Sequence, residues 1–186
     1  ENELIFENDK KIGKSKFNLN KTKRIVDYKI EKNSFDFHIF DRIDQPITSY
    51  RGNFNFKPFY ANLNGKSAEI NLNYLFGSNA IIAQILKTEI FNNKNIDFKF
   101  SINADNVYNN TSFRNINLNS KIREGLIDID NTKFEWRNFA NFELFESLIF
   151  VRDGELVLDG KLKINVKDYN KIYKLLLTPK NYRNKI

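Results

Sequence analysis

Apolar and polar residues alternate along most of this chain, and a period of two is typical of strands that bury one face. The clearest runs cover residues 96–105, 142–150 and 156–167, and shorter ones cover 17–19, 26–30, 35–39, 54–56, 116–122, 127–129 and 134–136. Because the connections between them are short, we predict about ten strands, mostly antiparallel. A strand from Ile96 to Tyr108 would span roughly 40 Å, about twice the usual length, which favours a barrel, a curled sheet or an elongated groove.

Short turns are predicted where residues that tolerate a positive φ follow one another. Asn64-Gly65 and Asp153-Gly154 are such pairs, Glu124-Gly125 separates two alternating runs, and the segment 44–46 interrupts the pattern. No stretch has the composition of an interdomain linker. We therefore expect residues 1–186 to form a single β-rich domain. Since the chain begins at Glu1 and contains no Met, we also expect it to be a piece of a longer, repetitive β protein.

Two segments change to helical spacing. The first begins near Ser78 or Asn79, either of which is a suitable N-cap, and its apolar residues are Leu75, Phe76, Ile81, Ile82, Ile85, Leu86 and Ile90. The second runs from Asp168, another suitable N-cap, to Thr178. The sequence thus predicts a mainly β fold with long antiparallel strands in a curled, β-taco-like sheet or groove, one internal helix and one C-terminal helix.

The formal net charge of +7 is unevenly distributed along the chain. Residues 167–186 carry +5 of it, whereas the long segment 87–166 carries −1. Lys outnumbers Arg by 22 to 8, and 29 Asn accompany them, which is the composition that an AT-rich genome gives to any protein. A nucleic-acid interface requires a basic stripe with Arg across the folded body, so we expect no nucleic acid as a partner.

The residue types present exclude most metal and nucleophile chemistry. The chain has no Cys and a single His, which excludes thiolate sites, Cys nucleophiles and zinc sites built from several His residues. His38 alternates with Phe37 and Ile39, which predicts a position away from their apolar face. Asp36 and Asp41 fall on opposite faces of the same strand and are poorly arranged to hold a cation. We predict no metal and no cofactor.

Paired-carboxylate catalysis is also disfavoured, because Glu143 and Glu146 fall on opposite faces of one strand. Glu146 lies in the apolar run, so we expect it near a strand end or paired with Arg137 or Arg152. No residue is therefore predicted to be catalytic. No stretch approaches roughly 18 consecutive apolar residues, and no membrane-spanning helix is predicted.

The chain is rich in aromatic residues, with 18 Phe, 8 Tyr and one Trp. Core packing is the first interpretation of such a composition. The alternative is that part of the apolar face stays uncovered by protein and holds hydrocarbon. The alternation of a strand does not separate these two interpretations.

Several segments follow one another in a characteristic order. They are "GNFNFKPF" in a strand, a short helix ending in "LKTEIFNNKN", a long strand containing "SINADNV", and "IREGLIDID" followed by Trp136. The order continues through "DGELVLDGKLKINVKDYNKIYK" near the C-terminus. With these segments, residues 48–186 resemble the C-terminal region of AsmA-family proteins. Residues 1–47 are interpreted as preceding strands of the same sheet.

The resemblance implies a periplasmic portion of a bacterial protein that is anchored in the inner membrane by a segment missing from this chain. It implies a curled β-groove with an apolar interior, a link to outer-membrane assembly proteins, and movement of phospholipid or another acyl-chain lipid between membranes without enzymatic activity. Alternation then gives the residues expected to line the groove, which are Phe98, Phe100, Ile102, Phe142, Leu144, Leu158, Leu162 and Ile164.

Two rival functions stay open. One is a structural or scaffold β domain for outer-membrane protein assembly, which differs from a lipid groove only in having its apolar face fully packed by protein. The other, less favoured, is a basic β module that binds RNA. It would require aromatic residues exposed between basic ones, whereas the aromatics here fall on the apolar faces of strands.

Overall fold

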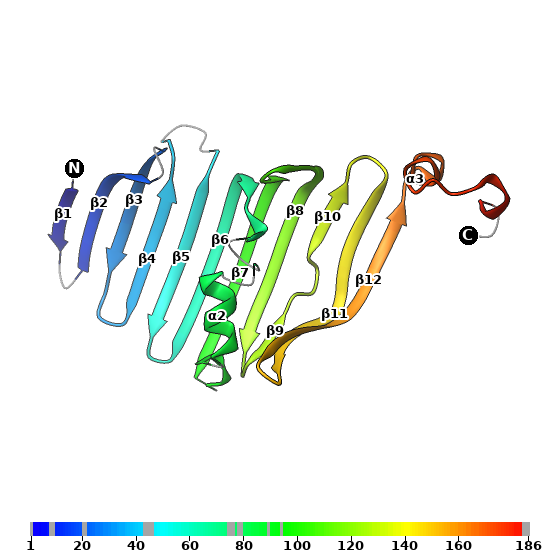
Figure 1. The fold of residues 1–186 in the computed structure, drawn as a ribbon. Coiled ribbons are helices and arrows are strands. Elements are labelled where there is room, and N and C mark those ends of the chain that lie inside the picture. Colours follow the sequence, from blue (N-terminus) through cyan, green and yellow to red (C-terminus); the bar gives the residue numbers. More distant parts are fainter. Residues whose placement is uncertain are drawn as a thin grey trace.

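The computed structural model describes residues 2–7, 10–19, 22–42, 47–73, 77, 80–88, 90–93 and 95–183. These residues form one mainly β fold, a twelve-stranded sheet in the order β1-β2-β3-β4-β5-β6-β7-β8-β10-β11-β12, with β9 beside β8 and β11 (Figure 1). The strands are β1 (Asn2–Glu7), β2 (Lys10–Leu19), β3 (Thr22–Ile30), β4 (Ser34–Phe40), β5 (Ser49–Phe56), β6 (Phe59–Ile70), β7 (Ile96–Val107), β8 (Asn110–Arg123), β9 (Leu126–Asp128), β10 (Lys133–Trp136), β11 (Ala140–Arg152) and β12 (Glu155–Val166).

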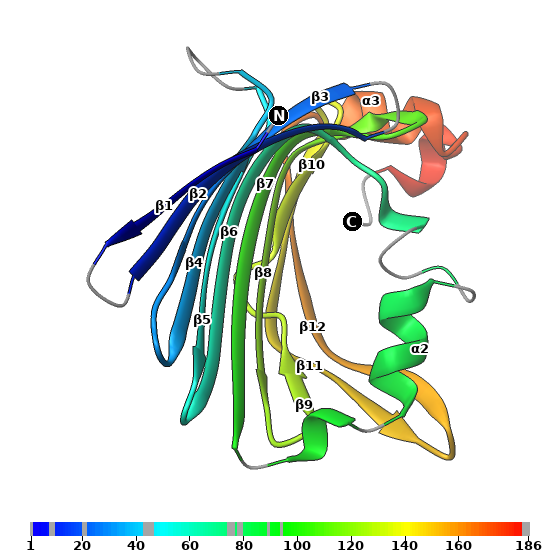
Figure 2. The ribbon, with the colours of Figure 1, turned by 90° about the vertical axis from the view of Figure 1, so that its left-hand side faces the viewer.

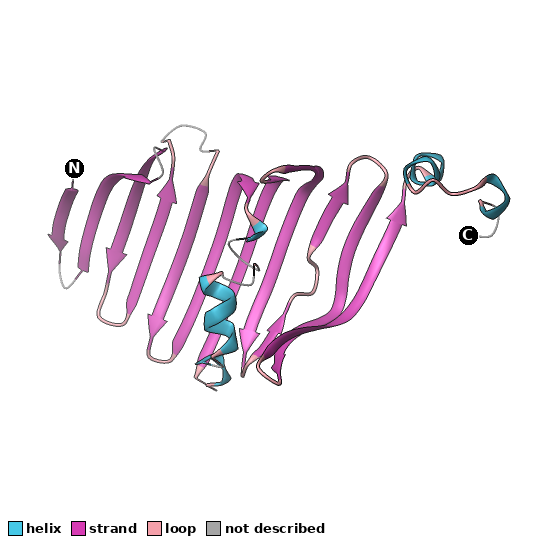
Figure 3. Ribbon diagram, in the orientation of Figure 1, coloured by secondary structure: helices cyan, strands magenta, loops and turns pink. Residues whose placement is uncertain are grey.

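The described residues include both helices that the sequence predicts (Figure 3). The internal helix α2 (Ile81–Lys87) is followed by the 3-10 turn η1 (Ile90–Asn92), and the C-terminal helix α3 (Tyr169–Leu175) by the turn η2 (Lys180–Tyr182). The predicted cap of α3 is confirmed, because the Asp168 side chain accepts a hydrogen bond from the backbone N of Lys171 at 3.0 Å. The N-cap position of α2 is instead Ala80, and the predicted caps Ser78 and Asn79, like Leu75 and Phe76, lie outside the described residues.

The sheet is curved, and α2 lies on its concave side (Figure 2). Pairing register shows why each face has one chemical character. Phe37, Gly52, Leu63, Phe100 and Ser120 form one row across β4 to β8 on the concave face. The next row, on the convex face, is polar throughout and contains His38, Arg51, Asn64, Ser101 and Asn119. A period of two thus sends most apolar positions of a regular strand to the same side. Ile25 and Phe40 are exceptions on the convex side, where the rings of Phe40 and His38 are 4.6 Å apart.

The two clusters of buried apolar side chains lie on the concave face of the C-terminal half. One cluster contains Ile70, Ile102, Ala104, Val107, Ile116 and Leu118, and a second contains Ile122, Ile127 and Ile129. Toward the N-terminus the same face is covered by aromatic rings, with Phe35, Phe37 and Phe54 stacked at centroid distances of 5.7 to 6.3 Å. Within the described ranges, α2, η1 and α3 all lie toward β7–β12 and away from β2–β5 (Figures 1 and 2).

The strand pairs are antiparallel except for β6 and β7, which are parallel and joined through α2. The prediction of mostly antiparallel strands is confirmed, and the described residues contain twelve strands where about ten were predicted. One turn prediction is wrong, because Asn64-Gly65 is not a hairpin turn but lies in the middle of β6. The predicted turns at Glu124-Gly125 and Asp153-Gly154 are confirmed, with φ of 50° and 76° in the first and 53° and 77° in the second. Segment 44–46 lies outside the described residues.

Glycine inside the strands is explained by the rings beside it. A Cβ atom on Gly65 would overlap the ring of Tyr50 on β5, and one on Gly52 would overlap the ring of Phe37 on β4. Each ring can lie flat against the neighbouring strand because the glycine has no side chain. Gly65 therefore serves close packing rather than a positive φ, which is why its turn-like sequence is misleading.

A β-bulge in β11 corrects a second prediction. The register with β12 shifts between Phe145 and Leu148, and Glu146 adopts a φ of 48°. The alternation predicted for 142–150 therefore breaks. Leu148 pairs with Asp128 and Asp159 on the convex side, whereas Ile149 pairs with Ile127 on the concave side. Since a bulge adds one residue to one strand, every later side chain changes face.

The ring contact over Gly65 can be tested by mutation. We expect Gly65→Ala to lower the free energy of unfolding by about 1–3 kcal/mol, because the new methyl group displaces Tyr50 from its position over β6. Urea unfolding would measure this change. In a Tyr50→Ser background the same substitution should cost much less, and an equal cost in both backgrounds would contradict the packing explanation.

Candidate functional site

A cavity of about 290 Å³ separates α2 from the concave face of the sheet. Its floor is formed by β6 to β9 and β11, and α2, η1 and Leu156 of β12 complete the wall. Every lining residue is aliphatic or aromatic except Ser120. Such a lining accepts hydrocarbon and offers no counter-charge to an ion.

Three contacts hold α2 and η1 over this cavity. Leu86 and Phe91 pack against the cluster of Ile122, Ile127 and Ile129. The backbone N of Gly125 donates to the carbonyl oxygen of Phe91 at 2.8 Å, which ties η1 to the β8–β9 turn. Lys87 Nζ lies 2.6 Å from Glu155 Oε2 and connects α2 to the tip of the β11–β12 hairpin, which bends toward the helix (Figure 2).

The structure places the eight predicted groove residues on the concave face, but in three different surroundings. Phe98, Phe100 and Ile102 of β7 line the cavity. Phe142 and Leu144 of β11 are half-buried beside it. The ring of Phe142 stacks on Phe134 at 4.9 Å, and Leu144 packs against the Ile122 cluster.

The other three predicted residues lie on β12, beyond the cavity. Leu158, Leu162 and Ile164 are 58%, 48% and 52% exposed. Leu162 pairs with Leu144 and Ile164 with Phe142, so the apolar face continues outward from the cavity along this strand. The resulting surface, from the cavity to Ile164, is referred to below as the apolar trough.

The other residues that line the cavity were not predicted from the sequence. They are Leu63, Ile85, Leu86, Phe91, Ile149 and Leu156, together with Leu118, Ser120, Ile122, Ile127 and Ile129. Leu118, Ser120 and Ile122 stand in an alternating run and were accessible to the same reasoning. Ile149 was not, because the bulge at Glu146 reverses its face.

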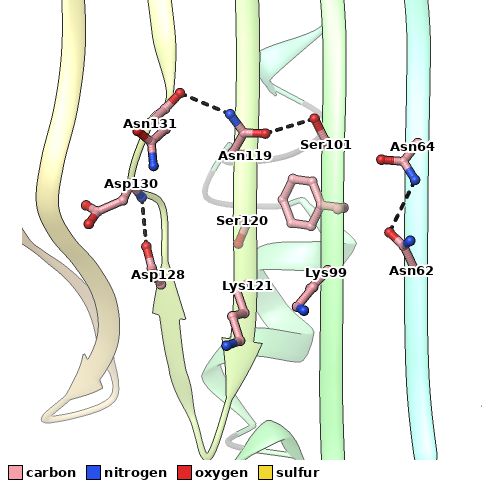
Figure 4. Close-up of a pocket in the computed structure, with 11 residues that line it drawn as sticks. Asn62, Asn64, Lys99, Ser101, Asn119, Ser120, Lys121, Asp128, Asp130 and Asn131 are labelled. Carbon is pink, nitrogen blue, oxygen red and sulfur yellow. Dashed lines mark hydrogen bonds between the residues drawn. The ribbon is translucent and has the colours of Figure 1, made fainter.

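The convex face carries a shallow polar depression of about 290 Å³ (Figure 4). Hydrogen bonds connect several of its polar side chains on the convex side. Ser101 Oγ donates to Asn119 Oδ1 at 2.8 Å, Asn119 Nδ2 donates to the carbonyl oxygen of Asn131 at 3.0 Å, and Asn64 Nδ2 donates to Asn62 Oδ1 at 3.3 Å. With these groups already partnered, the depression is best explained as a solvated face of the sheet.

The acidic residues considered for chemistry are engaged in structural contacts. Asp36 accepts a hydrogen bond from Asn53, and Asp41 Oδ1 accepts one from the backbone N of Thr48 at 3.2 Å. Glu143 pairs with Lys133 at 2.9 Å. Among the described residues, no group of three or more His, Asp or Glu side chains could hold a metal ion.

Glu146 has a different partner from the two that were predicted. Its carboxylate pairs with Lys161 on β12, rather than with Arg137 or Arg152, and it is exposed at the bulge. His38 lies on the convex side, as predicted, and its Nε2 is 2.9 Å from Ser49 Oγ. Partial burial and the nearby charge of Arg51 lower the pKa of His38, so that the neutral ring is favoured.

Comparisons with protein-family models, with curated proteins and with solved structures found no match. The similarity to AsmA-family proteins therefore stays a prediction from the sequence segments quoted above. In the part of the chain that the structure describes, no helix is long and apolar enough to cross a membrane.

His38 gives the fold a pH dependence whose sign follows from its lowered pKa. Below pH 6.5, the ordinary pKa of His, the imidazole of His38 takes up a proton more readily in the unfolded chain than in the folded protein. Stability is therefore complete above pH 6.5 and is lost as the pH falls through and below that value. The measurement is urea unfolding between pH 7.5 and about 5.5.

The control for this prediction is His38→Gln, which should flatten the pH dependence over that interval. His38 is the only His of the chain, so no second imidazole obscures the comparison. An equally steep dependence in the variant would show that the titrating group lies elsewhere.

Proposed function

We propose that the apolar trough holds acyl chains of a lipid, with phospholipid as the foremost candidate, and that it does so without a covalent step. The observation that carries this proposal is the cavity beneath α2, lined by apolar side chains and continued by exposed Leu158, Leu162 and Ile164 on β12. Exposed apolar surface next to an apolar cavity is typical of ligand-binding surfaces.

The free energy available from such a surface is large. Each CH₂ group removed from water contributes about 0.8 kcal/mol, so a fully buried chain of about fourteen carbons would contribute on the order of 11 kcal/mol. The trough is open along β12, and a chain lying there would bury only part of its surface. The part under α2 is enclosed and would therefore bind most strongly.

The shape of the site also fits a lipid whose head group remains in water. The lining of the cavity contains no charged side chain, and the exposed positions of β12 lie at the edge of the sheet. Outside the cavity, side chains of similar character repeat along β12, so no single position on this strand is strongly preferred. A lipid tail could then move along the strand while its head group stays solvated.

The cellular setting is proposed on the resemblance alone. Similarity to AsmA-family proteins suggests the periplasmic part of a bacterial inner-membrane protein. The partners would be phospholipid and the outer-membrane assembly machinery, and the role would be lipid transport between the two membranes during outer-membrane biogenesis.

A packed scaffold domain is the second candidate, and one observation favours it. Leu86 and Phe91 already cover the cluster of Ile122, Ile127 and Ile129, and further protein could cover the rest of the trough in the same way. RNA binding has less support, because Lys14, Lys133 and Lys161 pair with acidic neighbours on adjacent strands.

Native mass spectrometry of the chain purified from bacteria, with lipid analysis of its denatured extract, tests the lipid proposal. We expect co-purified phospholipid, and transfer of a phospholipid with a fluorescent acyl chain from vesicles to the protein. Leu162→Lys should reduce this binding about tenfold or more, because a charge replaces an apolar side chain in the trough. Leu162 is half exposed, so the fold should tolerate the change.

The matched control is Leu148→Lys on the neighbouring strand. Leu148 is 36% exposed and lies on the convex side opposite Asp159, so the same substitution there should leave lipid binding unchanged. A clean unliganded mass together with no uptake of the fluorescent lipid would favour the scaffold. Equal loss of binding in both variants would show that the effect is not local to the trough.

A further inference from the structure

The cavity beneath α2 contains one polar side chain whose hydroxyl has no partner in the protein. Ser120 is 7% exposed, and its Oγ has no hydrogen-bond partner. It alternates with Leu118 and Ile122 on β8, and all three line the cavity. The hydroxyl is therefore on the apolar side of the sheet, facing the space under the helix.

The other buried hydroxyls of the described residues are all satisfied. Ser67 Oγ donates to the carbonyl oxygen of Glu69 at 2.8 Å, and Ser147 Oγ to that of Phe145 at 2.9 Å. Thr132 Oγ1 donates to the carbonyl oxygen of Asn119 at 3.2 Å. Ser120 is thus the exception in a sheet that otherwise pairs its buried hydroxyls, and such exceptions require an explanation.

We propose that Ser120 is a hydrogen-bonding anchor for a ligand, and that the cavity binds an aliphatic chain carrying one neutral oxygen, such as a hydroxyl or an ester carbonyl. This inference rests on the proposed function and adds the chemistry of the group that enters the cavity. A serine hydroxyl both donates and accepts, so it matches either kind of oxygen. The apolar surroundings favour a dry cavity, in which a ligand atom is the natural partner.

The oxygen has to be neutral because of what surrounds it. The lining of the cavity contains no Lys, Arg or His, and Ser120 is its single polar side chain. A buried carboxylate would lose its hydration and gain only one hydrogen bond, which is strongly unfavourable. A free fatty acid should therefore keep its carboxylate outside, whereas an alcohol or an ester can place its oxygen beside Ser120.

The test is a thermodynamic cycle between the protein hydroxyl and the ligand oxygen. Binding of 1-decanol and of decane would be compared in the unchanged protein and in Ser120→Ala, with methyl nonanoate and decanoate as further arms. The readout is the NMR shift of labelled methyl groups at Leu118, Ile122 and Ile127, which reports binding in this cavity. In a cycle the cost of dehydrating each ligand cancels.

We expect Ser120→Ala to weaken decanol and methyl nonanoate binding by about threefold to tenfold relative to decane, the effect of one neutral hydrogen bond. Of the four ligands, decanoate should bind the unchanged protein most weakly, as judged from the NMR shifts of these methyl groups. Ser67→Ala is the matched control, because Ser67 is 8% exposed on the same face and already has a protein partner. It should leave the preference for decanol unchanged.

A second measurement needs no ligand. Removing an unpartnered buried hydroxyl should leave the unfolding temperature unchanged or raise it, whereas Ser67→Ala should lower it. A loss of stability in Ser120→Ala equal to that in Ser67→Ala would show a protein partner for the hydroxyl and overturn the inference.

The two proposals fail in different ways. If decane and decanol bind and Ser120→Ala weakens both equally, the anchor is wrong and the apolar trough still binds hydrocarbon. If none of the four ligands shifts the cavity methyl groups, while the methyl groups of Leu158 and Leu162 respond to phospholipid, the trough binds lipid without a cavity anchor. If neither set of methyl groups responds, both proposals fail.

Discussion

A single-layered sheet must find a cover for its apolar face, and the rest of this structure depends on how that requirement is met. Alternation across twelve strands of the described chain collects most of the apolar residues on the concave side. A sandwich would bury that side against a second sheet. Here one short helix and one 3-10 turn lie over part of it, and the apolar area left over is worth about 25 cal/mol for each Å² that something else removes from water.

The two halves of the sheet meet this requirement differently. Toward the N-terminus the rings of Phe37 and Tyr50 lie against Gly52 and Gly65, so each ring covers part of the neighbouring strand and is itself half-buried. Toward the C-terminus no glycine of the described residues accepts a neighbouring ring in this way, and the aliphatic residues, together with Phe98 and Phe100, need a separate element over them. The helix α2 supplies it only in part, and the space between helix and sheet remains as the cavity.

The sequence could predict which residues line the cavity only where a strand is regular. Alternation was enough to place Phe98, Phe100 and Ile102 in the cavity, because β7 is regular from Ile96 to Ala104 and its neighbours keep its register. Alternation failed beyond Glu146, where one inserted residue reverses the faces. Turn propensity failed at Gly65, where packing against Tyr50 outweighs it. Neither effect is visible in a single strand, since both depend on the partner strand. The contributions of Leu86 and Phe91 likewise depend on where a helix packs, which periodicity alone does not fix.

Ser120 bears on the choice between a carrier and a scaffold in a way that the apolar residues do not. Aliphatic side chains suit a packed core and a lipid groove equally well, so their number and exposure do not distinguish the two functions. A hydroxyl among these side chains does distinguish them, because a core closed by protein would have to provide a partner or tolerate an unpaired polar group.

Ser67 and Ser147 show that this fold satisfies buried hydroxyls from its own backbone. At Ser120 the backbone of β8 does not do so, and the neighbouring side chains Leu118, Ile122 and Phe100 have no polar atom to offer. Under the proposed anchor the partner enters from the cavity, which is the expectation for a site that takes up a ligand.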